Sequence, residues 1–307
     1  MSEPAVSISP QAELFVLCDD WKSEILAARK SDEITWESER YPNDEMNFQL
    51  GVDKSHKWER ITMWVRFTSK ERLEMQVMRL LLMAEIASHY CEHLELKLPY
   101  LPYSLQDREV RPGDSAAARV FIRAVEGAGV QSVVIIDAHS PRNIQDWSIP
   151  VSHLRPERVL ADAIQAELGE EEVAVVAPDK GAVTRATLMG EYLHSEVYQL
   201  QKERLGPGDV KISATALEGC PAAHLLLVDD ILNTGGTLVQ SIRAIRDTCP
   251  AKMSVVVTHG FFVKLAHQRL LDAGARYIFF TDSFLSGIDE SQLGIQKVSV
   301  LPLLLAG

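Results

Sequence analysis

Residues 225–238 read LLLVDDILNTGGTL, and this stretch points to the fold class of the whole chain. An apolar run typical of a buried strand leads into two adjacent acids, Asp229 and Asp230. A short loop with two glycines follows, and then Leu238 and Ile242 lie four residues apart, as on one face of a helix. A strand, a glycine-rich turn and an amphipathic helix in this order indicate an α/β fold with a mostly parallel sheet.

The same pattern of an apolar strand followed by polar residues recurs along the chain. Apolar runs of strand character lie at residues 133–136, 173–176, 225–228, 255–257 and 277–280. Polar and often acidic side chains follow each run, such as Asp137 after the first and Asp179 after the second. Because ligands of open parallel α/β sheets bind outside the carboxyl ends of the strands, these five ends predict a binding site.

The earlier part of the chain predicts further elements of the same kind. Two more strands are predicted at residues 13–18 and 61–67. A capping-box pattern at residues 68–71 predicts the start of a long helix that reaches about His93. Strand and helix therefore alternate from the beginning of the chain, as in the later part.

A break in this alternation indicates two domains. Ile-Pro and Arg-Pro pairs interrupt the periodic pattern around residues 149–157, and both flanking halves contain strand–helix repeats. We therefore predict two α/β domains, residues 1–152 and 153–307, each with a mostly parallel sheet flanked by helices. Residues 206–209, Gly-Pro-Gly-Asp, predict a turn or mobile loop within the second domain.

The composition indicates a soluble, cytoplasmic protein. The chain has 307 residues, of which 46% are hydrophobic and 24% charged. No apolar run reaches the roughly 20 residues that cross a bilayer, and residues 1–11 lack the features of a signal peptide. The four cysteines lie far apart, so we expect reduced thiols and no metal or redox pair. A net charge of −12 argues against nucleic acid as a partner but is compatible with a small phosphorylated ligand.

The loop after the paired acids combines three features of a phosphate site. Its glycines allow positive φ and close backbone approach, its threonines supply hydroxyl donors, and a helix N-terminus follows. The residues concerned are Asn233, Thr234, Gly235, Gly236 and Thr237. Asp229 and Asp230 can accept hydrogen bonds from the vicinal hydroxyls of a sugar, so the stretch predicts a site for a pentose 5-phosphate. A strand, turn and helix without a ligand is the simpler alternative, which the combination of paired acids and threonines disfavours.

Residues 225–238 are similar to the motif for 5-phosphoribosyl 1-pyrophosphate (PRPP) that type I phosphoribosyltransferases and ribose-phosphate pyrophosphokinases share. Other segments resemble the pyrophosphokinases in family order: residues 41–45, 103–112, 137–140, 177–186 and 202–204. The resemblance extends over roughly residues 12–285. It implies two phosphoribosyltransferase-like (type I) domains and an enzyme that transfers a diphosphoryl group from ATP to ribose 5-phosphate.

The resemblance also implies roles for individual residues. Residues at positions of the family's nucleotide site are Tyr41, Asn43, Glu45, Gln106, Asp107 and Arg108. Catalytic roles fall to Lys202 and Arg204, and also to His139, which with Asp179 is placed near Mg²⁺. Members of this family usually form oligomers whose subunits share nucleotide sites, so the resemblance further implies a homo-oligomer.

Three departures from the family pattern concern the nucleotide side. Asn43 and Asp44 stand where the family usually has Asp and Gly, and Leu105 replaces a common Arg. The Cys-Asp-Asp near the start and the Phe-Thr-Asp-Ser near the end resemble a divergent branch, such as the class II enzymes of plants. Two alternatives therefore remain beside a Mg²⁺-dependent pyrophosphokinase: a non-catalytic regulatory homologue, and a relative that uses a different acceptor or donor.

Overall fold

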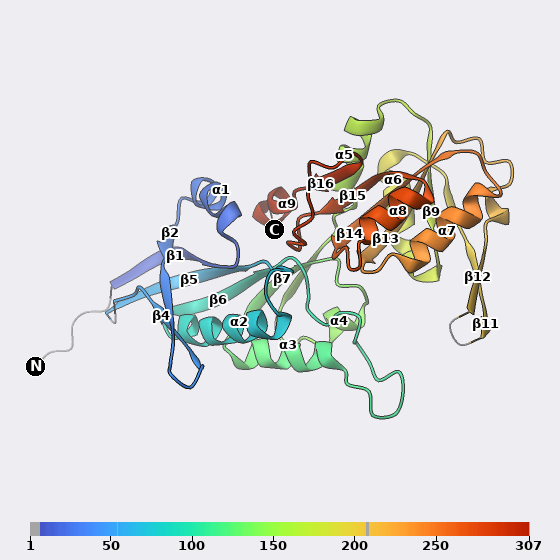
Figure 1. Ribbon diagram of the computed structural model, residues 1–307. Helices are drawn as coiled ribbons and strands as arrows, with labels where there is room; N and C mark the ends of the chain where they lie inside the picture. Colours follow the sequence, from blue (N-terminus) through green and yellow to red (C-terminus); the bar gives the residue numbers. More distant parts are fainter. Residues whose placement is uncertain (1–6, 54, 207–208, 307) are drawn as a thin grey trace, which may run out of the picture. The chain divides into compact units, whose positions relative to one another are not determined.

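The protein folds into two compact units. The computed structural model describes residues 7–53, 55–206 and 209–306, with the backbone alone for Ser7, Asp19, residues 202–206 and residues 209–211. The first unit extends to Leu154 and the second covers Arg155–Val300, as the colour gradient of Figure 1 shows. Within the described residues, no helix is long and apolar enough to span a membrane.

The last helix belongs to the first unit, although we predicted residues 153–307 as one domain. Helix α9 (Leu301–Ala306) groups with the first unit. There the Lys97 ammonium donates to the Leu304 carbonyl over 3.4 Å, and Lys97 itself is buried. A buried cation on a strand therefore receives a partner from the end of the chain.

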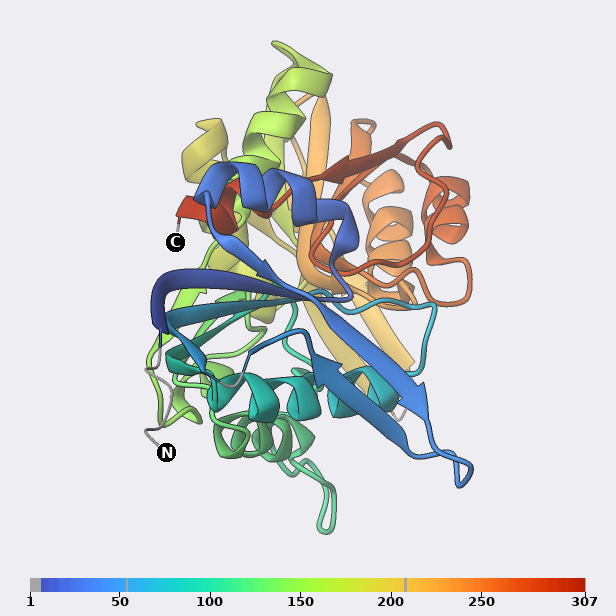
Figure 2. The same ribbon diagram turned by 90° about the vertical axis from the view of Figure 1, so that its left-hand side faces the viewer.

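The first unit is built on a six-stranded parallel sheet. Its order is β2-β1-β5-β6-β7-β8. The strands are β1 (Ser7–Val16), β2 (Asp32–Ile34), β5 (His56–Val65), β6 (Cys91–Leu98), β7 (Ser132–Ile136) and β8 (Val151–Leu154). Helices α2 (Leu73–Ser88) and α3 (Ala117–Gly127) cover one face, and α1 (Asp19–Arg29) and α9 lie on the other (Figures 1 and 2). An antiparallel hairpin of β3 (Trp36–Arg40) and β4 (Met46–Leu50) and the short α4 (Arg142–Gln145) complete the unit.

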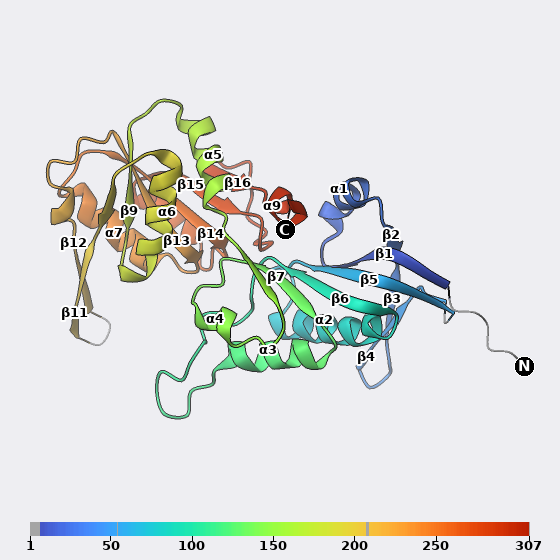
Figure 3. The same cartoon turned by 180° about the vertical axis from the view of Figure 1, so that it is seen from behind.

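The second unit repeats this plan. Its parallel sheet has the order β10-β9-β13-β14-β15-β16. The strands are β9 (Val173–Ala177), β10 (Val197–Gln199), β13 (His224–Leu232), β14 (Lys252–Gly260), β15 (Ala275–Thr281) and β16 (Ile295–Val298). Helices α5 (Glu157–Leu168) and α6 (Val183–Leu193) cover one face, and α7 (Gly236–Arg246) and α8 (Ala266–Ala273) the other (Figure 3). The antiparallel pair β11 (Gln201–Gly206) and β12 (Asp209–Ser213) extends from it. Two mostly parallel sheets flanked by helices confirm the predicted fold class.

Strand β13 shows how the apolar run forms the core. Leu225 and Leu227 pack with the residues of α7 and α8, whereas Leu226 and Val228 pack with those of α5 and α6. This alternation follows from the two-residue period of a strand, which sends successive side chains to opposite faces. Burying each leucine contributes about 1.5–3 kcal/mol, so the run holds both helical layers on the sheet.

The predicted long helix was wrong at both ends. Helix α2 covers only Leu73–Ser88, and strand β6 follows at Cys91–Leu98. This strand pairs with β5 on one side and β7 on the other, so sheet pairing overrides the helical pattern. The capping box does not form either: Thr68 Oγ1 accepts from Lys70 N over 3.2 Å, within the turn before the helix.

Candidate functional site

The candidate site lies where β13 passes into α7. Strand β13 continues to Leu232, so Asp229 and Asp230 lie within the strand, near its carboxyl end. Asp229 pairs with Val257 of β14. Helix α7 begins at Gly236 without a side-chain cap, which leaves the amides of its first turn for an anion. The loop between them, with exposed Asn233 and Thr234, is open to solvent.

Gly235 is required by the shape of this loop. Its φ is +71°, in the left-handed region that side chains other than glycine rarely adopt. A Cβ atom at this position would also lie 3.2 Å from Leu232 Cδ1 and 3.6 Å from Ala266 Cβ. Glycine therefore lets the loop pass close over α8 and turn its backbone into the start of α7.

The carbonyl groups at the start of the loop of residues 233–237 accept hydrogen bonds from neighbouring segments. Arg269 Nη1 on α8 donates to the Thr234 carbonyl over 2.9 Å, and Val263 N donates to the Asn233 carbonyl over 3.0 Å. Phe261 N donates to the Leu232 carbonyl over 2.8 Å. With these carbonyls engaged by the protein, the amides and threonine hydroxyls remain the groups that the loop offers to a ligand.

The two adjacent acids have different surroundings because they point to opposite faces of β13. Asp230 shares the face of Leu226 and Val228, where its Oδ2 forms an ion pair with Arg185 Nη2 of α6 at 3.1 Å. Asp230 is 6% exposed, so this pair is shielded from water. The Asp229 carboxyl accepts instead from the amide of Asp230, over 3.0 Å.

The titration of Asp229 is perturbed. Burial and, second, the charge of Asp230 raise the pKa of Asp229 to about 7, while Arg185 opposes the rise. Asp179, at the end of β9, adds a smaller upward contribution to the same pKa. Asp230 and Asp179 thus both act on the Asp229 carboxyl, at the carboxyl ends of β9 and β13.

Asp179 caps the turn after β9. Its Oδ1 accepts from Gly181 N over 2.9 Å, at the start of the short helix η1 (Lys180–Ala182). The Gly181 carbonyl in turn accepts from Arg185 Nη1 over 3.3 Å. A carboxylate oxygen of this kind is a suitable ligand for Mg²⁺.

The polar residues at the carboxyl ends of β14 and β15 are buried and hydrogen-bonded within the protein. His259 Nδ1 and Ser283 Oγ lie 2.8 Å apart, and Thr281 Oγ1 donates to the Thr258 carbonyl over 2.7 Å. Asp282 Oδ1 accepts from Val300 N over 2.8 Å. These side chains therefore brace the carboxyl edge of the sheet, a structural role that their sequence positions alone did not distinguish from binding.

Lys202 and Arg204 lie on β11. Their backbones pair with Ile212 and Val210 of β12, and their side chains lie outside the described residues. The predicted turn at residues 206–209 falls partly outside the described residues as well. The catalytic roles of Lys202 and Arg204 remain predictions.

In the first unit, the Asp-x-His turn follows β7 in a strained conformation. Asp137 and His139 have φ values of +42° and +65°, and Asp137 is buried. The turn is held by Asn143, whose Nδ2 donates to the Ala138 carbonyl over 2.7 Å, and by His153, whose Nε2 accepts from Ala138 N over 3.1 Å. Backbone strain that the surroundings enforce in this way is common at functional sites.

The Gln-Asp-Arg segment lies beside this turn. Ser140 Oγ donates to Asp107 Oδ2 over 2.8 Å, and Asp107 is only 5% exposed. Arg108 Nε contacts the other Asp107 oxygen at 3.1 Å, whereas Gln106 and Arg108 are exposed. The structure thus brings residues 106–108 and the His139 turn together through Asp107. The exposed side chains of Gln106 and Arg108 can contact a ligand.

Tyr41, Asn43 and Glu45 form the exposed tip of the β3–β4 hairpin. Tyr41 N donates to the Glu45 carbonyl over 2.9 Å, and Asp44 N donates to the Tyr41 carbonyl over 2.8 Å. Asp44 has a φ of +71°, a conformation that Asp tolerates better than most residues. The departure from the family's glycine therefore preserves the left-handed turn that a glycine would adopt.

The proposed metal residues belong to different units. His139 lies in the first unit and Asp179 in the second, and each is described within its own unit. Among the described residues there is no group of three or more His, Cys, Asp or Glu side chains arranged to hold a metal ion. The carboxylate of Asp179 suits Mg²⁺, whereas imidazole suits softer ions, so His139 fits better as a donor to phosphate or to metal-bound water.

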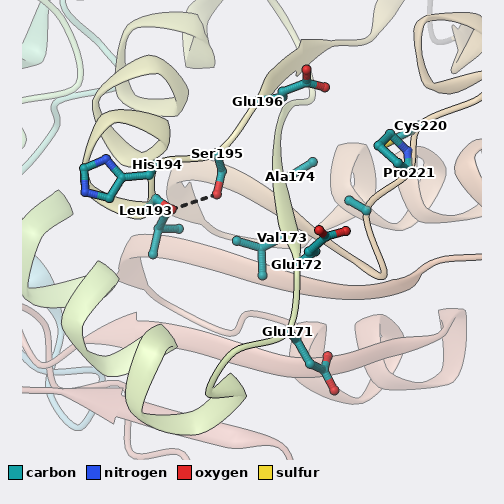
Figure 4. Close-up of a pocket in the computed structure, with 11 residues that line it drawn as sticks. Glu171, Glu172, Val173, Ala174, Leu193, His194, Ser195, Glu196, Cys220 and Pro221 are labelled. Atoms are coloured by element: carbon teal, nitrogen blue, oxygen red, sulfur yellow. Dashed lines mark hydrogen bonds between the residues drawn. The ribbon is translucent and has the colours of Figure 1, made fainter.

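A separate cavity lies at the opposite, amino end of the second sheet (Figure 4). It measures about 360 Å³ and is lined by residues that include Glu171, His194, Glu196 and Cys220. Glu171 also accepts from Lys252 Nζ over 2.7 Å and pairs with His224 Nδ1 at 3.0 Å. The cavity is lined by none of the residues that the sequence singled out for binding.

Sequence reasoning missed two arginines of the site, Arg185 and Arg269. Arg185 lies on the buried face of α6 with Ala186 and Met189, so a charged residue within an apolar helical stripe was the available signal. No sequence pattern identified Arg269, because its contact with Thr234 joins residues 35 positions apart. Arg185 contacts the Asp230 side chain and the Gly181 carbonyl, and Arg269 contacts the Thr234 carbonyl.

The fold and the loop define a protein of the phosphoribosyltransferase-like α/β class. Residues 152–287 match the phosphoribosyl transferase domain family. The structure is similar to that of phosphoribosylpyrophosphate synthetase from Mycobacterium smegmatis, with a TM-score of 0.83 over 97% of both chains and 20% identity, a likeness of fold.

The sequence relatives narrow this class to one family. Ribose-phosphate pyrophosphokinase of Methanopyrus kandleri is 30% identical over 205 residues, which cover 67% of each chain. The enzyme of the same name from Pyrococcus furiosus is 29% identical over 68% of this chain and 74% of its own. The alignment with that of Thermococcus kodakarensis, at 33% identity, covers 58% of this chain and 62% of the relative, less than two thirds of its length. The chain belongs to the ribose-phosphate pyrophosphokinase family and is an enzyme of that type.

Proposed function

We propose that this enzyme transfers the β,γ-diphosphoryl group of ATP to the C1 hydroxyl of ribose 5-phosphate, giving PRPP and AMP. The observation that carries the proposal is the loop of residues 233–237, which joins an uncapped helix N-terminus to two acids on the preceding strand. The proposal includes action as a homo-oligomer, as the sequence resemblance implied, and in the cytoplasm, as the composition indicated.

In this reaction the C1 oxygen forms a new bond to the β-phosphorus, and the bond between that phosphorus and the α,β-bridging oxygen breaks. The hydroxyl proton leaves to solvent, and AMP takes the bridging oxygen with its electron pair. Such a transfer depends on alignment of the two substrates and on cations that offset the charge of the diphosphoryl oxygens.

The residues of the second unit would bind and orient the acceptor. The amides and hydroxyls of Thr234–Thr237 would hold the 5-phosphate, since a helix N-terminus favours an anion. Asp229 and Asp230 would accept hydrogen bonds from the ribose hydroxyls. Lys202 and Arg204, on the β11–β12 hairpin, would offset charge on the transferring group.

The nucleotide side would be formed by the first unit. Tyr41, Asn43 and Glu45 would receive the base, with Gln106, Asp107 and Arg108 toward the phosphates. In the second unit, the Asp179 carboxylate would hold Mg²⁺, which would offset negative charge on the diphosphoryl oxygens. The role of His139 of the first unit near the metal stays a prediction.

The test is to incubate the protein with ribose 5-phosphate, ATP and Mg²⁺ and to follow ³¹P signals. The proposal predicts PRPP and AMP in equal amounts, with no product when ribose replaces its 5-phosphate. Binding of ribose 5-phosphate without turnover would favour a regulatory homologue or another donor, and no binding at all would refute the proposal.

Lys202→Ala should separate chemistry from binding. Removing one charge-stabilising contact typically costs about 3–4 kcal/mol of barrier, or roughly 10²–10³ in rate. We expect kcat to fall by this factor while the Kd of ribose 5-phosphate, measured by calorimetry, stays nearly unchanged. An equal loss in both quantities would show that Lys202 does not have the assigned role.

A further inference from the structure

Arg185 is a charged residue whose helix turns it into the protein. On α6 it shares the buried face with Ala186, Met189 and Gly190, and it is 7% exposed. Removing a guanidinium from water costs several kcal/mol unless partners compensate. The buried guanidinium of Arg185 therefore requires partners that compensate for the lost water.

Its two terminal nitrogens contact two different parts of the candidate site. Arg185 Nη2 lies 3.1 Å from Asp230 Oδ2, on the strand that leads into the phosphate loop. Arg185 Nη1 donates to the Gly181 carbonyl over 3.3 Å, in the turn that Asp179 caps. One planar guanidinium thus spans from the acid on the ribose side to the turn that presents Asp179.

From this geometry we infer that Arg185 is a positioning residue for the transfer, which fixes Asp230 and the Asp179 turn relative to each other. It acts through these groups and need not touch a substrate. A planar fork with donors in fixed directions suits this role better than the single ammonium of a lysine. The inference rests on the proposed function, because it assigns the aligned groups to ribose 5-phosphate and to the diphosphoryl side.

Three variants separate positioning from packing. Arg185→Met and Arg185→Lys both keep a long, helix-compatible side chain, but only Lys keeps a cation for Asp230. Arg276→Met serves as the matched control, because Arg276 pairs with Glu171 at the amino end of the same sheet, at 3.6 Å. The readouts are the Kd of ribose 5-phosphate by calorimetry and kcat under saturating substrates.

We expect Arg185→Met to raise the Kd of ribose 5-phosphate at least about 30-fold, as when one partner of a buried charge pair is removed. Arg185→Lys should keep Kd within about fivefold, since the charge opposite Asp230 remains, but lower kcat about tenfold, since the Gly181 contact is lost. Arg276→Met should leave both quantities unchanged. Equal values of Kd for the Met and Lys variants would indicate packing and overturn the inference.

A double variant tests whether the effect passes through Asp230. In the Asp230→Asn background, Arg185→Met should add less than about threefold to the Kd, because the interaction is already lost. Fully additive effects would contradict the inference. If Arg185→Met does not fold, the Lys variant still decides: a fall in kcat without a matching rise in Kd supports positioning, and no change or equal losses refute it.

The same measurements distinguish this inference from the proposed function. Failure of the unmodified protein to bind ribose 5-phosphate would refute the proposed function. Binding and turnover by the unmodified protein, together with unchanged constants in Arg185→Met, would refute only the role of Arg185.

Discussion

The two ends of the sheet in the second unit treat acidic side chains in opposite ways. At the amino end, Glu171 accepts from Lys252 and pairs with His224, and these contacts lower the pKa of Glu171 to about 2. At the carboxyl end, burial and the charge of Asp230 raise the pKa of Asp229 to about 7. Contacts at the amino end stabilise a negative charge, whereas the carboxyl end places acidic side chains close together.

This difference supports our proposal that the carboxyl end of the sheet binds the substrate. Paired charges at the amino end contribute to folding, although a cavity of about 360 Å³ lies there (Figure 4). Adjacent acids at the carboxyl end cost stability, and such a cost persists where a ligand or reaction needs it. Hydroxyl donors of a sugar and a nearby cation would offset the charge, as we propose for the carboxyl end.

The largest effect should come from Gly235→Val in the phosphate loop. A β-branched residue at a φ of +71° with its Cβ 3.2 Å from Leu232 Cδ1 would displace the loop. We expect the affinity for ribose 5-phosphate to fall about 100-fold, or about 3 kcal/mol, by calorimetry.

Gly169→Val is the matched control for this change. Gly169 has a φ of +63° and follows α5, where a Cβ would meet nothing within 4 Å. It should lower the melting temperature through similar backbone strain and leave the affinity unaltered. A loss of affinity in both variants would mean that strain anywhere in the unit, and not the loop itself, controls binding.

Next in size is the effect of pH on the binding of ribose 5-phosphate. Because the pKa of Asp229 is raised to about 7, its carboxylate form increases between pH 6 and pH 8. If only that form accepts the ribose hydroxyls, affinity should rise about tenfold over this interval. Asp229→Asn should retain only the smaller change that comes from the second ionisation of the sugar phosphate, near pH 6. The same pH profile in both proteins would exclude Asp229 as the titrating group.

A smaller but more diagnostic contrast concerns stability. A carboxyl whose pKa is raised on folding lowers stability above its unfolded pKa of about 4, so Asp229→Asn should stabilise the protein at pH 8. Glu171 has a lowered pKa and contributes stability at that pH, so Glu171→Gln should destabilise it. Urea unfolding measures both, and shifts of the same sign would remove the contrast between the two ends.

The sequence was sufficient to predict the two mostly parallel sheets, and the site at their carboxyl edge stays a prediction. Apolar runs such as residues 225–228 form buried strands, because a continuous apolar run suits a parallel strand that is covered on both faces. The strand at Cys91–Leu98 was missed, because its mixed polar composition continues the helical pattern in the sequence. Its strand conformation comes from pairing with β5 and β7.

The site was predictable only in part. The acids and glycines of the loop are contiguous in sequence, so residues 229–237 could be identified together. The opposite orientation of Asp229 and Asp230 follows from the two-residue period of a strand that runs to Leu232, four residues beyond its predicted end. The pairing of Arg185 with Asp230 joins residues on different elements, and local sequence does not encode such a contact.

The most direct test of the central claim is a crystal structure of the protein with ribose 5-phosphate. We predict the phosphate within hydrogen-bonding distance of the amides at the start of α7, with the ribose hydroxyls toward Asp229. A sugar phosphate in the cavity beside Glu171 and Glu196, with the loop of residues 233–237 empty at a saturating concentration, would contradict the claim that the carboxyl end of this sheet is the binding site.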